Sequence, residues 1–222
     1  MEIPDFLKTK PVFLLMRPFA IVQYGPPRSG STLVYNILTE LFPGKKIFKV
    51  HMLRKMCSVL NTVGTYRNPL DSIASSLLVH GIDHPSDDDV KRHVSTFISS
   101  GFNQITQTLE SQNTVMLKYE DFMCDYNVIF NAIEGLFSID VTENKRSSLK
   151  EKYGIKAVER KIEDLNGFAE TDKKTKLHGN HISKHKGQGG YYKEVFSDRQ
   201  IQIILNEFGE TMEKLGYDVS IS

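Results

Sequence analysis

The sequence predicts an α/β protein with a central parallel sheet and helices on both faces. Four short apolar runs alternate along the chain with segments whose apolar residues recur at helical spacing. Parallel strands need crossover connections, usually helices, so this alternation is typical of a parallel sheet that is covered on both sides. A turn rich in Gly, Pro and hydroxyl residues joins the first strand to the first helix. Such a turn predicts a cradle for an anion, because backbone N–H groups and the helix N-terminus converge there.

The individual elements follow from local patterns. After an irregular lead-in over residues 1–18, strands are expected at 19–24, 45–51, 62–66 and 114–119. Helices are expected from Ser31 to Pro43-Gly44, from Pro69 over one further apolar face, at 90–109, at 128–137 and at 198–215. Residues 52–60 are expected to form a short helix or turn, 81–89 a mobile loop, and 142–176 a charged, helix-prone stretch.

Length and composition indicate a single domain spanning residues 1–222. The formal net charge of +1 argues against a broad nucleic-acid-binding surface, so an anion site must be local. Cys57 and Cys124 have no metal-ligand spacing and are expected to be reduced thiols. The apolar run at 11–16 is far shorter than the about 20 residues of a membrane span, and no signal peptide is recognisable. A soluble, cytoplasmic protein without membrane contact is therefore expected.

The cradle departs from the phosphate loop of nucleoside triphosphatases at one position. Gly25 and Gly30 fit that loop's two fixed glycines, but Ser31 stands where its lysine is needed. Arg28 instead places a guanidinium inside the turn, and its planar fork can hold two oxygens of one tetrahedral anion. The turn is thus a P-loop-like strand-loop-helix with a different cation.

This cradle resembles the 5′-phosphosulfate loop of sulfotransferases that use 3′-phosphoadenosine 5′-phosphosulfate (PAPS). The matching residues are Pro27, Arg28, Ser29, Gly30, Ser31 and Thr32, and the resemblance implies that they bind the nucleotide. A second segment, from Tyr66 to Ser76, resembles the family's 3′-phosphate motif. Arg67 at a strand end and Ser75 on the next helix can converge on one phosphate.

Two later segments resemble further motifs of that family, in the family's order. Residues 117–122 are similar to its Tyr-Glu-Asp segment, which implies that Tyr119 lies beside the adenine. His185, Lys186 and Gly187 resemble the late Arg-Lys-Gly loop, which implies that residues 178–193 close over the nucleotide. The likeness extends from about residue 19 to the C-terminus, although only these segments and one residue pair are specific.

That pair is Lys49 and His51, which end the second strand one residue apart and so share a face. They match the family's Lys-x-His. The resemblance implies that His51 is the general base, that Lys49 is a cation near the bridging oxygen, and that Arg28 is a cation on the 5′-phosphate. Should His51 fail as the base, Glu40 or the loop around His84 would be the next candidates.

Two departures from the family's pattern concern nucleotide binding. His185 stands where the family commonly has Arg, which makes that phosphate contact weaker and dependent on pH. Leu33 takes the place of an adenine-stacking Trp, and the chain contains no Trp at all. Base stacking must therefore come from another group or be weaker.

The sequence as a whole predicts sulfuryl transfer from PAPS, with 3′,5′-diphosphoadenosine (PAP) as product and no metal. The expected partner is a small-molecule or peptide acceptor that carries a hydroxyl or amine. Two alternatives stay open: a P-loop kinase or NTPase, and a non-catalytic module that binds 3′-phosphorylated adenosine nucleotides. The missing loop lysine disfavours the first, and the Lys49–His51 pair disfavours the second.

Overall fold

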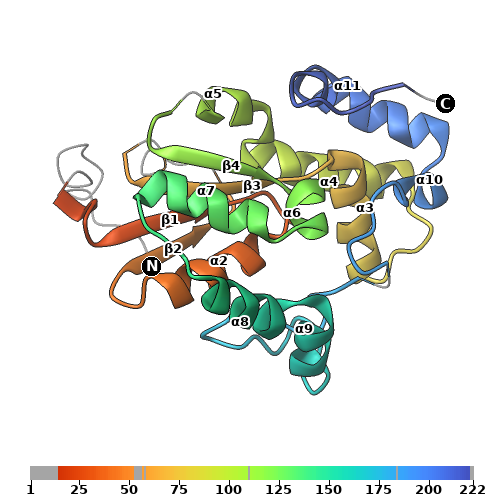
Figure 1. Ribbon diagram of the computed structural model, residues 1–222. Helices are drawn as coiled ribbons and strands as arrows, with labels where there is room; N and C mark the ends of the chain where they lie inside the picture. The colour runs from red at the N-terminus through yellow and green to blue at the C-terminus, as the bar shows by residue number, and fades with distance from the viewer. Residues whose placement is uncertain (1–14, 53–56, 58, 110, 184, 221–222) are drawn as a thin grey trace.

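Four parallel strands form the centre of the molecule (Figure 1). The computed structural model describes residues 15–52, 57, 59–109, 111–183 and 185–220. The strands are β1 (Ala20–Tyr24), β2 (Lys46–Val50), β3 (Asn61–Tyr66) and β4 (Thr114–Lys118), in the sheet order β2-β1-β3-β4. The predicted parallel α/β class is confirmed, and each strand lies within two residues of its expected bounds. Most of the lead-in and most of the turn expected at 52–60 lie outside the described residues.

The sheet is covered on both faces because alternate residues of a buried strand point in opposite directions. In β1, which is buried throughout, Ala20, Val22 and Tyr24 join one core cluster and Ile21 joins the other. The first cluster includes apolar residues of α3 (Pro69–Val79), α4 (Asp87–Ser100) and α11 (Asp198–Lys214). The second includes residues of α2 (Ser31–Leu41), α7 (Asn127–Phe137) and α8 (Glu143–Tyr153).

The expected long helix at 90–109 is wrong, because glycine divides it. Helix α4 already begins at Asp87, where Ser86 and Asp89 form a capping box, so the end of the expected loop at 81–89 is helical. Gly101 ends α4 with φ 80°, a left-handed conformation that glycine adopts without steric cost. A 3₁₀ turn (Phe102–Gln104) and the short helix α5 (Ile105–Leu109) follow.

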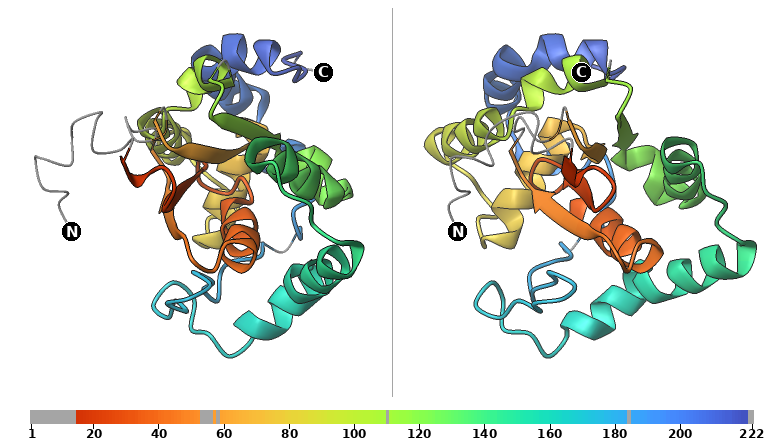
Figure 2. Two further views of the ribbon diagram at one scale, coloured as in Figure 1. Left: turned by 60° about the vertical axis from the view of Figure 1, so that its left-hand side comes forward. Right: turned by 90° about the vertical axis from the view of Figure 1, so that its left-hand side faces the viewer.

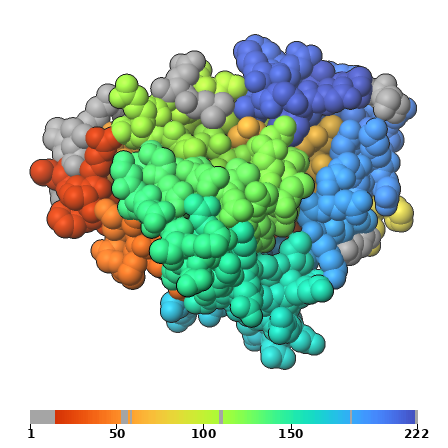
Figure 3. Space-filling view, viewed as in Figure 1, coloured from red at the N-terminus to blue at the C-terminus, as the bar shows by residue number. Residues whose placement is uncertain are grey.

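The charged stretch after α7 forms α8 and α9 (Ile155–Ile162), which project from the sheet (Figure 2). In the space-filling view these two helices, in teal, cover the lower part of the molecule (Figure 3). The chain then returns to the carboxyl edge of the sheet with no further helix until α10 (Tyr192–Val195). A hydrogen bond attaches this part of the chain to α2: Asn36 Nδ2 donates to the Thr175 carbonyl at 2.9 Å.

The strand ends decide where the site lies. β1, β2 and β3 run parallel, and β4 is followed directly by α6 (Tyr119–Cys124), so Tyr119 opens a helix and does not end a strand. The cradle, His51, Arg67 and Tyr119 therefore all meet at one edge, where open parallel sheets bind ligands. None of the helices in the described ranges is long and apolar enough to cross a bilayer.

Candidate active site

The turn between β1 and α2 has the backbone conformation of an anion cradle. Arg28 and Gly30 both have positive φ, at 63° and 75°. A Cβ on Gly30 would lie 2.7 Å from the Phe122 ring and 2.9 Å from the Tyr119 ring, so only glycine fits. The backbone N–H groups of Gly30, Ser31 and Thr32 donate to no acceptor in the described part of the chain. Three unused donors at the N-terminus of α2 make this turn a candidate anion site.

Ser29 supports this turn from behind. Its side chain is buried, and its Oγ donates to the Pro26 carbonyl at 2.7 Å and lies 2.8 Å from Thr65 Oγ1. Gly25 leaves room for this contact, because a Cβ there would lie 2.8 Å from Ser29 Oγ. The hydroxyl of Ser29 therefore holds the loop against β3 and does not line the pocket.

A cavity of about 440 Å³ lies in front of the cradle. Among the described residues, no Asp or Glu lines it. The basic side chains in its wall are Arg28, Lys49, Arg67, Lys176 and Lys186 together with His51, His80, His178 and His181. In a chain with a formal net charge of +1, this concentration of basic groups is local and favours an anionic ligand.

His51 is held in one tautomer by the cradle itself. Its Nδ1 lies 2.8 Å from the Gly25 carbonyl oxygen, and because a carbonyl can only accept, Nδ1 carries the proton. Its Nε2 is then an acceptor, 3.3 Å from Lys49 Nζ. Removal from bulk water and the neighbouring Lys49 lower the pKa of His51, so the ring is neutral at pH 7. Removal from water and Lys176 lower the pKa of Lys49 to about 8.

Arg28 points across the pocket from the turn. Its Nε donates to Ser75 Oγ at 3.0 Å, and its Nη2 donates to the His181 carbonyl at 2.9 Å. Burial lowers its pKa, and the neighbouring Arg67 acts in the same direction. The guanidinium is thus bound by neutral oxygens that an anion could replace.

Arg67 is 3% exposed and lies below the closing segment. Its Nη2 donates to the carbonyls of Gly187 and Gln188 at 3.3 and 3.1 Å, and its guanidinium lies 4.2 Å from the centre of the Tyr119 ring. Its Nε is buried without a partner in the described part of the chain. A buried donor left unpaired is costly, and a bound anion would satisfy it.

Asp71 holds the closing segment in place. Its carboxylate accepts from the backbone N–H of Gly190 at 2.9 Å and from that of Tyr192 at 3.4 Å. The Tyr191 hydroxyl donates to the Asp71 carbonyl at 2.9 Å. These contacts bring Lys186 and Gly187 to the pocket wall, where Lys186 also pairs with Glu159 at 2.7 Å.

Most residues singled out from the sequence meet in this pocket. Its wall contains Pro27, Arg28, Gly30, Ser31, Thr32, Lys49, His51, Arg67, Ser75, Tyr119, Lys186 and Gly187. His185 does not line it, since its ring stacks on Tyr191 with centroids 4.5 Å apart. The alternative base Glu40 faces α8, where it accepts from Lys152 at 2.8 Å and from the Tyr153 hydroxyl at 3.1 Å.

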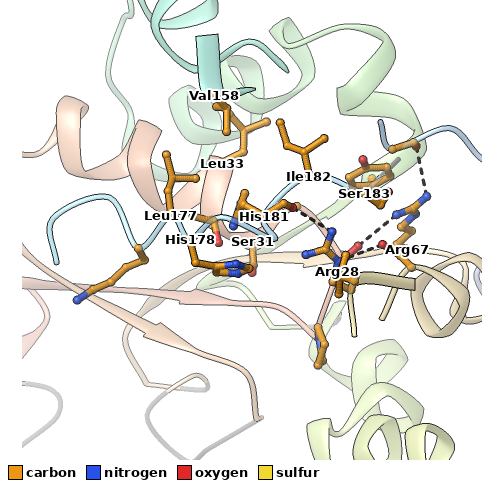
Figure 4. Close-up of a pocket in the computed structure, with 18 of the residues that line it drawn as sticks. Arg28, Ser31, Leu33, Arg67, Val158, Leu177, His178, His181, Ile182 and Ser183 are labelled. Carbon is orange, nitrogen blue, oxygen red and sulfur yellow. Dashed lines mark hydrogen bonds between the residues drawn. The ribbon is translucent and has the colours of Figure 1, made fainter. Parts of the chain in front are cut away.

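Sequence reasoning placed residues 178–193 over the nucleotide but gave no role to the histidines of the returning segment, residues 163–183 after α9. His178 and His181 join the wall from that segment, with their ring centroids 5.0 Å apart, and Phe168 lies 4.7 Å from His178. The view in Figure 4 has the two arginines at one end, apolar side chains at the other and the two histidines between them. The labelled apolar side chains are Leu33, Val158, Leu177 and Ile182. The only signal in the sequence was the short His-Gly-Asn-His run, which has no helical or strand periodicity.

Known structures share this fold. Mouse sulfotransferase SULT7A1 complexed with PAP matches with a TM-score of 0.65 and 15% identity over 94% of this chain and 91% of that one. Retinol dehydratase with androsterone and the inactive cofactor PAP matches at 0.63 and 14%, over 92% and 83%. Retinol dehydratase with retinol and PAP matches at 0.62 and 16%, over 99% and 88%.

No protein-family model and no curated protein sequence matches this chain. The structural matches nevertheless cover nearly all of it, so the chain has the sulfotransferase fold, as the motifs predict.

Proposed function

We propose that this protein is a sulfotransferase that transfers the sulfuryl group of PAPS to a hydroxyl or amine acceptor. The observation that carries the proposal is the pocket without a carboxylate in its described wall, in which three groups meet: the cradle, the Lys49–His51 pair and the Arg67–Ser75 pair. That these groups line one pocket supports the roles that the resemblance implies for them. The neighbours of the same fold were crystallised with PAP, which supports the choice of nucleotide.

The residues present fit a nucleotide with phosphates at both ends. The unused N–H groups of the cradle and the guanidinium of Arg28 would hold the 5′-phosphosulfate. Arg67, with its unpaired buried Nε, and Ser75 would hold the 3′-phosphate, and Lys186 and Gly187 would close over it. Tyr119, whose ring lies against the Arg67 guanidinium, would contact the adenine. Leu33 adds an apolar surface where the family has Trp.

PAPS supplies the sulfuryl group, which passes to the acceptor and leaves PAP. The task of His51 is to remove the proton of the acceptor hydroxyl or amine at Nε2, and the hydrogen bond to Gly25 keeps that nitrogen unprotonated. Lys49 lies next to the same nitrogen and provides positive charge where the leaving oxygen becomes negative. Arg28 stabilises negative charge on the 5′-phosphate side.

The acceptor is proposed to be a small molecule with an apolar body. The pocket wall away from the arginines contains Tyr153, Val158, Leu177 and Ile182. Neighbouring structures of this fold contain androsterone or retinol, both apolar alcohols. A peptide acceptor is the alternative.

Two rival functions would need different groups in the pocket. A kinase or NTPase needs a cation in the position of Ser31 and groups that hold Mg²⁺, whereas no Asp or Glu lines the described wall. A module that only binds nucleotide has no need for a neutral imidazole held in one tautomer beside a lysine.

Calorimetry with PAP, and separately with ATP plus Mg²⁺, tests the nucleotide. PAP should bind without metal and raise the melting temperature, as any ligand selective for the native state does, and ATP should do much less. A screen of alcohols, phenols and amines with ³⁵S-labelled PAPS then tests transfer. Equal stabilisation by ATP, or a requirement for Mg²⁺, would support the kinase; PAP binding without transfer to any acceptor would support the binding module.

A further inference from the structure

Two histidines in the pocket wall have no role in the reaction described above. His178 and His181 come from the returning segment, and Arg28 ties that segment to the cradle through the His181 carbonyl. The Nδ1 atom of each ring is buried without a hydrogen-bond partner in the described part of the chain. No hydrogen bond to either Nε2 is formed there, and neither Nε2 is buried. Both rings therefore have unused hydrogen-bonding capacity beside the cradle.

Among the described residues, the groups whose charge acts on this pair are all basic. Arg28 faces it from the cradle, Lys49 from β2 and His80 from the end of α3, and each histidine faces the other. With burial as the larger cause, these groups lower the pKa of His178 to about 4 and that of His181 to about 3. Without an anion, both rings are therefore neutral at pH 7.

We propose that His178 and His181 are ligands of the anion bound in the cradle and take up protons when it binds. The inference rests on the proposed function for its ligand, a nucleotide with phosphate or phosphosulfate groups. An anion in the cradle would offset the repulsion from Arg28 and Lys49 that now adds to burial in opposing protonation. An opposite charge within about 4–6 Å moves the pKa of a side chain by about one to three pH units, which brings these two rings toward the neutral range.

Protonation also provides donors where the anion needs them. An imidazolium donates from both nitrogens, so each accessible Nε2 becomes a charge-assisted donor to the anion. When Arg28 turns to the anion, the carbonyls of Asn180 and His181 lose their donors, Arg28 Nη1 and Nη2 respectively.

The consequence is that anion affinity depends on pH. Because binding raises the pKa of both rings, affinity rises as pH falls from about 7.5 toward 5.5, and by linkage the bound anion favours the protonated protein. Lys49, with a pKa of about 8, and His51 line the same pocket and also titrate near this range. The part of the pH dependence that belongs to the pair is therefore the part that the double variant His178→Gln/His181→Gln loses.

Proton NMR of the histidine rings tests this directly. The chain has seven histidines, and His178→Gln and His181→Gln assign the two signals. With saturating PAP, the pKa of both should rise by at least one pH unit relative to the free protein. His84→Gln assigns a control signal outside the pocket wall, and PAP should leave that signal unchanged.

Calorimetry at pH 6.5 in buffers of different ionisation enthalpy measures the protons taken up with PAP. The phosphates of PAP titrate in this range too, so the contribution of the pair is the difference between the wild type and the double variant His178→Gln/His181→Gln. Uptake should be larger in the wild type, and the double variant should lose about tenfold in affinity at pH 6 but less at pH 8.

Binding of PAP with unchanged or lowered pKa values of both rings would overturn the inference and leave the proposed function standing. Equal proton uptake in the wild type and the double variant would do the same. Failure of PAP to bind the wild type at all would overturn both.

Discussion

At the scale of single residues, a hydrogen bond joins the cradle to His51, the proposed base. The carbonyl of Gly25, the first residue of the turn, accepts from His51 Nδ1 and so selects the tautomer whose Nε2 can take a proton. The histidine follows β2 and the glycine follows β1, and these strands are neighbours in the sheet. A shift of the cradle would therefore change the chemistry as well as the binding.

His51→Ala should lower turnover with PAPS by about 10²–10⁴-fold, the usual contribution of a positioned base. PAP affinity should stay within a few-fold, because the base faces the acceptor. Glu40→Gln is the matched control and should keep most of the turnover, since Glu40 faces α8. The opposite ranking of these two variants would assign the base to Glu40.

The pKa of His51 should set the pH at which the rate falls on the acid side of the pH–rate profile. Burial and Lys49 lower the pKa of His51, so the wild-type rate should fall only below the ordinary imidazole value of about 6.5, as the ring gains a proton and can no longer accept one. Rates measured from pH 5 to 8 check this. A residual activity in His51→Ala with the same acid limb would show that another group titrates.

Arg67→Ala should weaken PAP binding by about ten- to hundredfold. Charge-assisted hydrogen bonds are worth about 1.5–3 kcal/mol each, and Arg67 is proposed to make them to the 3′-phosphate. Adenosine 5′-phosphosulfate, which has no 3′-phosphate, should lose little affinity. Arg92→Ala, which changes an exposed arginine of α4, is the control.

Arg67 also donates to the carbonyls of Gly187 and Gln188. The melting temperature of the Arg67→Ala variant must therefore be measured alongside its nucleotide affinities. An equal loss of affinity for both nucleotides would mean that Arg67 acts by holding the closing segment in place.

At the scale of elements, the unit proposed to bind phosphate is β1, the turn and α2 together. The helix begins directly after a glycine with left-handed backbone, and that glycine packs against α6. The turn is therefore shaped by contacts with a helix about 90 residues later in the chain as well as by its own residues.

Gly30→Ala should lose PAP binding and lower the melting temperature. The left-handed conformation costs a residue with Cβ about 1–2 kcal/mol, and the new methyl would meet the Tyr119 and Phe122 rings. For a chain of this size each kcal/mol corresponds to about 2–4 °C. Gly44→Ala is the control, because Gly44 has an ordinary φ and open space around its Cα. Thermal unfolding and calorimetry of both variants check this, and equal PAP binding by the two would contradict the cradle.

At the scale of the whole molecule, the pocket brings together basic side chains that repel one another when they are charged. Basic groups from the cradle, β2, β3 and the returning segment surround a cavity that no Asp or Glu of the described wall balances. The stability of the free protein should therefore depend on pH through the histidines of that wall.

The free energy of unfolding should fall as pH is lowered from about 6.5 toward 4. His178 and His181 have folded-state pKa values of about 4 and 3, below the unfolded value of about 6.5, so the unfolded chain binds more protons in this window. Urea unfolding at pH 7.5, 6 and 5 measures the slope. The double variant His178→Gln/His181→Gln should show a shallower slope, and an unchanged slope would show that other groups dominate.

The sequence by itself determined the order of strands and helices, the cradle and the pairs Lys49–His51 and Arg67–Ser75. These are local signals: periodicity identifies an element, and small or hydroxyl residues identify the turn that follows it. Since parallel strands end at one edge of the sheet, local assignments were sufficient to predict that these residues meet.

Only the tertiary structure decided the far wall of the pocket and the state of its charges. His181 contacts Arg28 across 153 positions of the chain, from a segment without periodicity, so no local pattern could place it. The same contact fixes how Arg28 is bound, and the lowered pKa values of the histidines depend on burial beside Arg28 and Lys49. Burial and charge proximity are properties of the folded chain, which is why the candidate proton-linked ligands emerged only there.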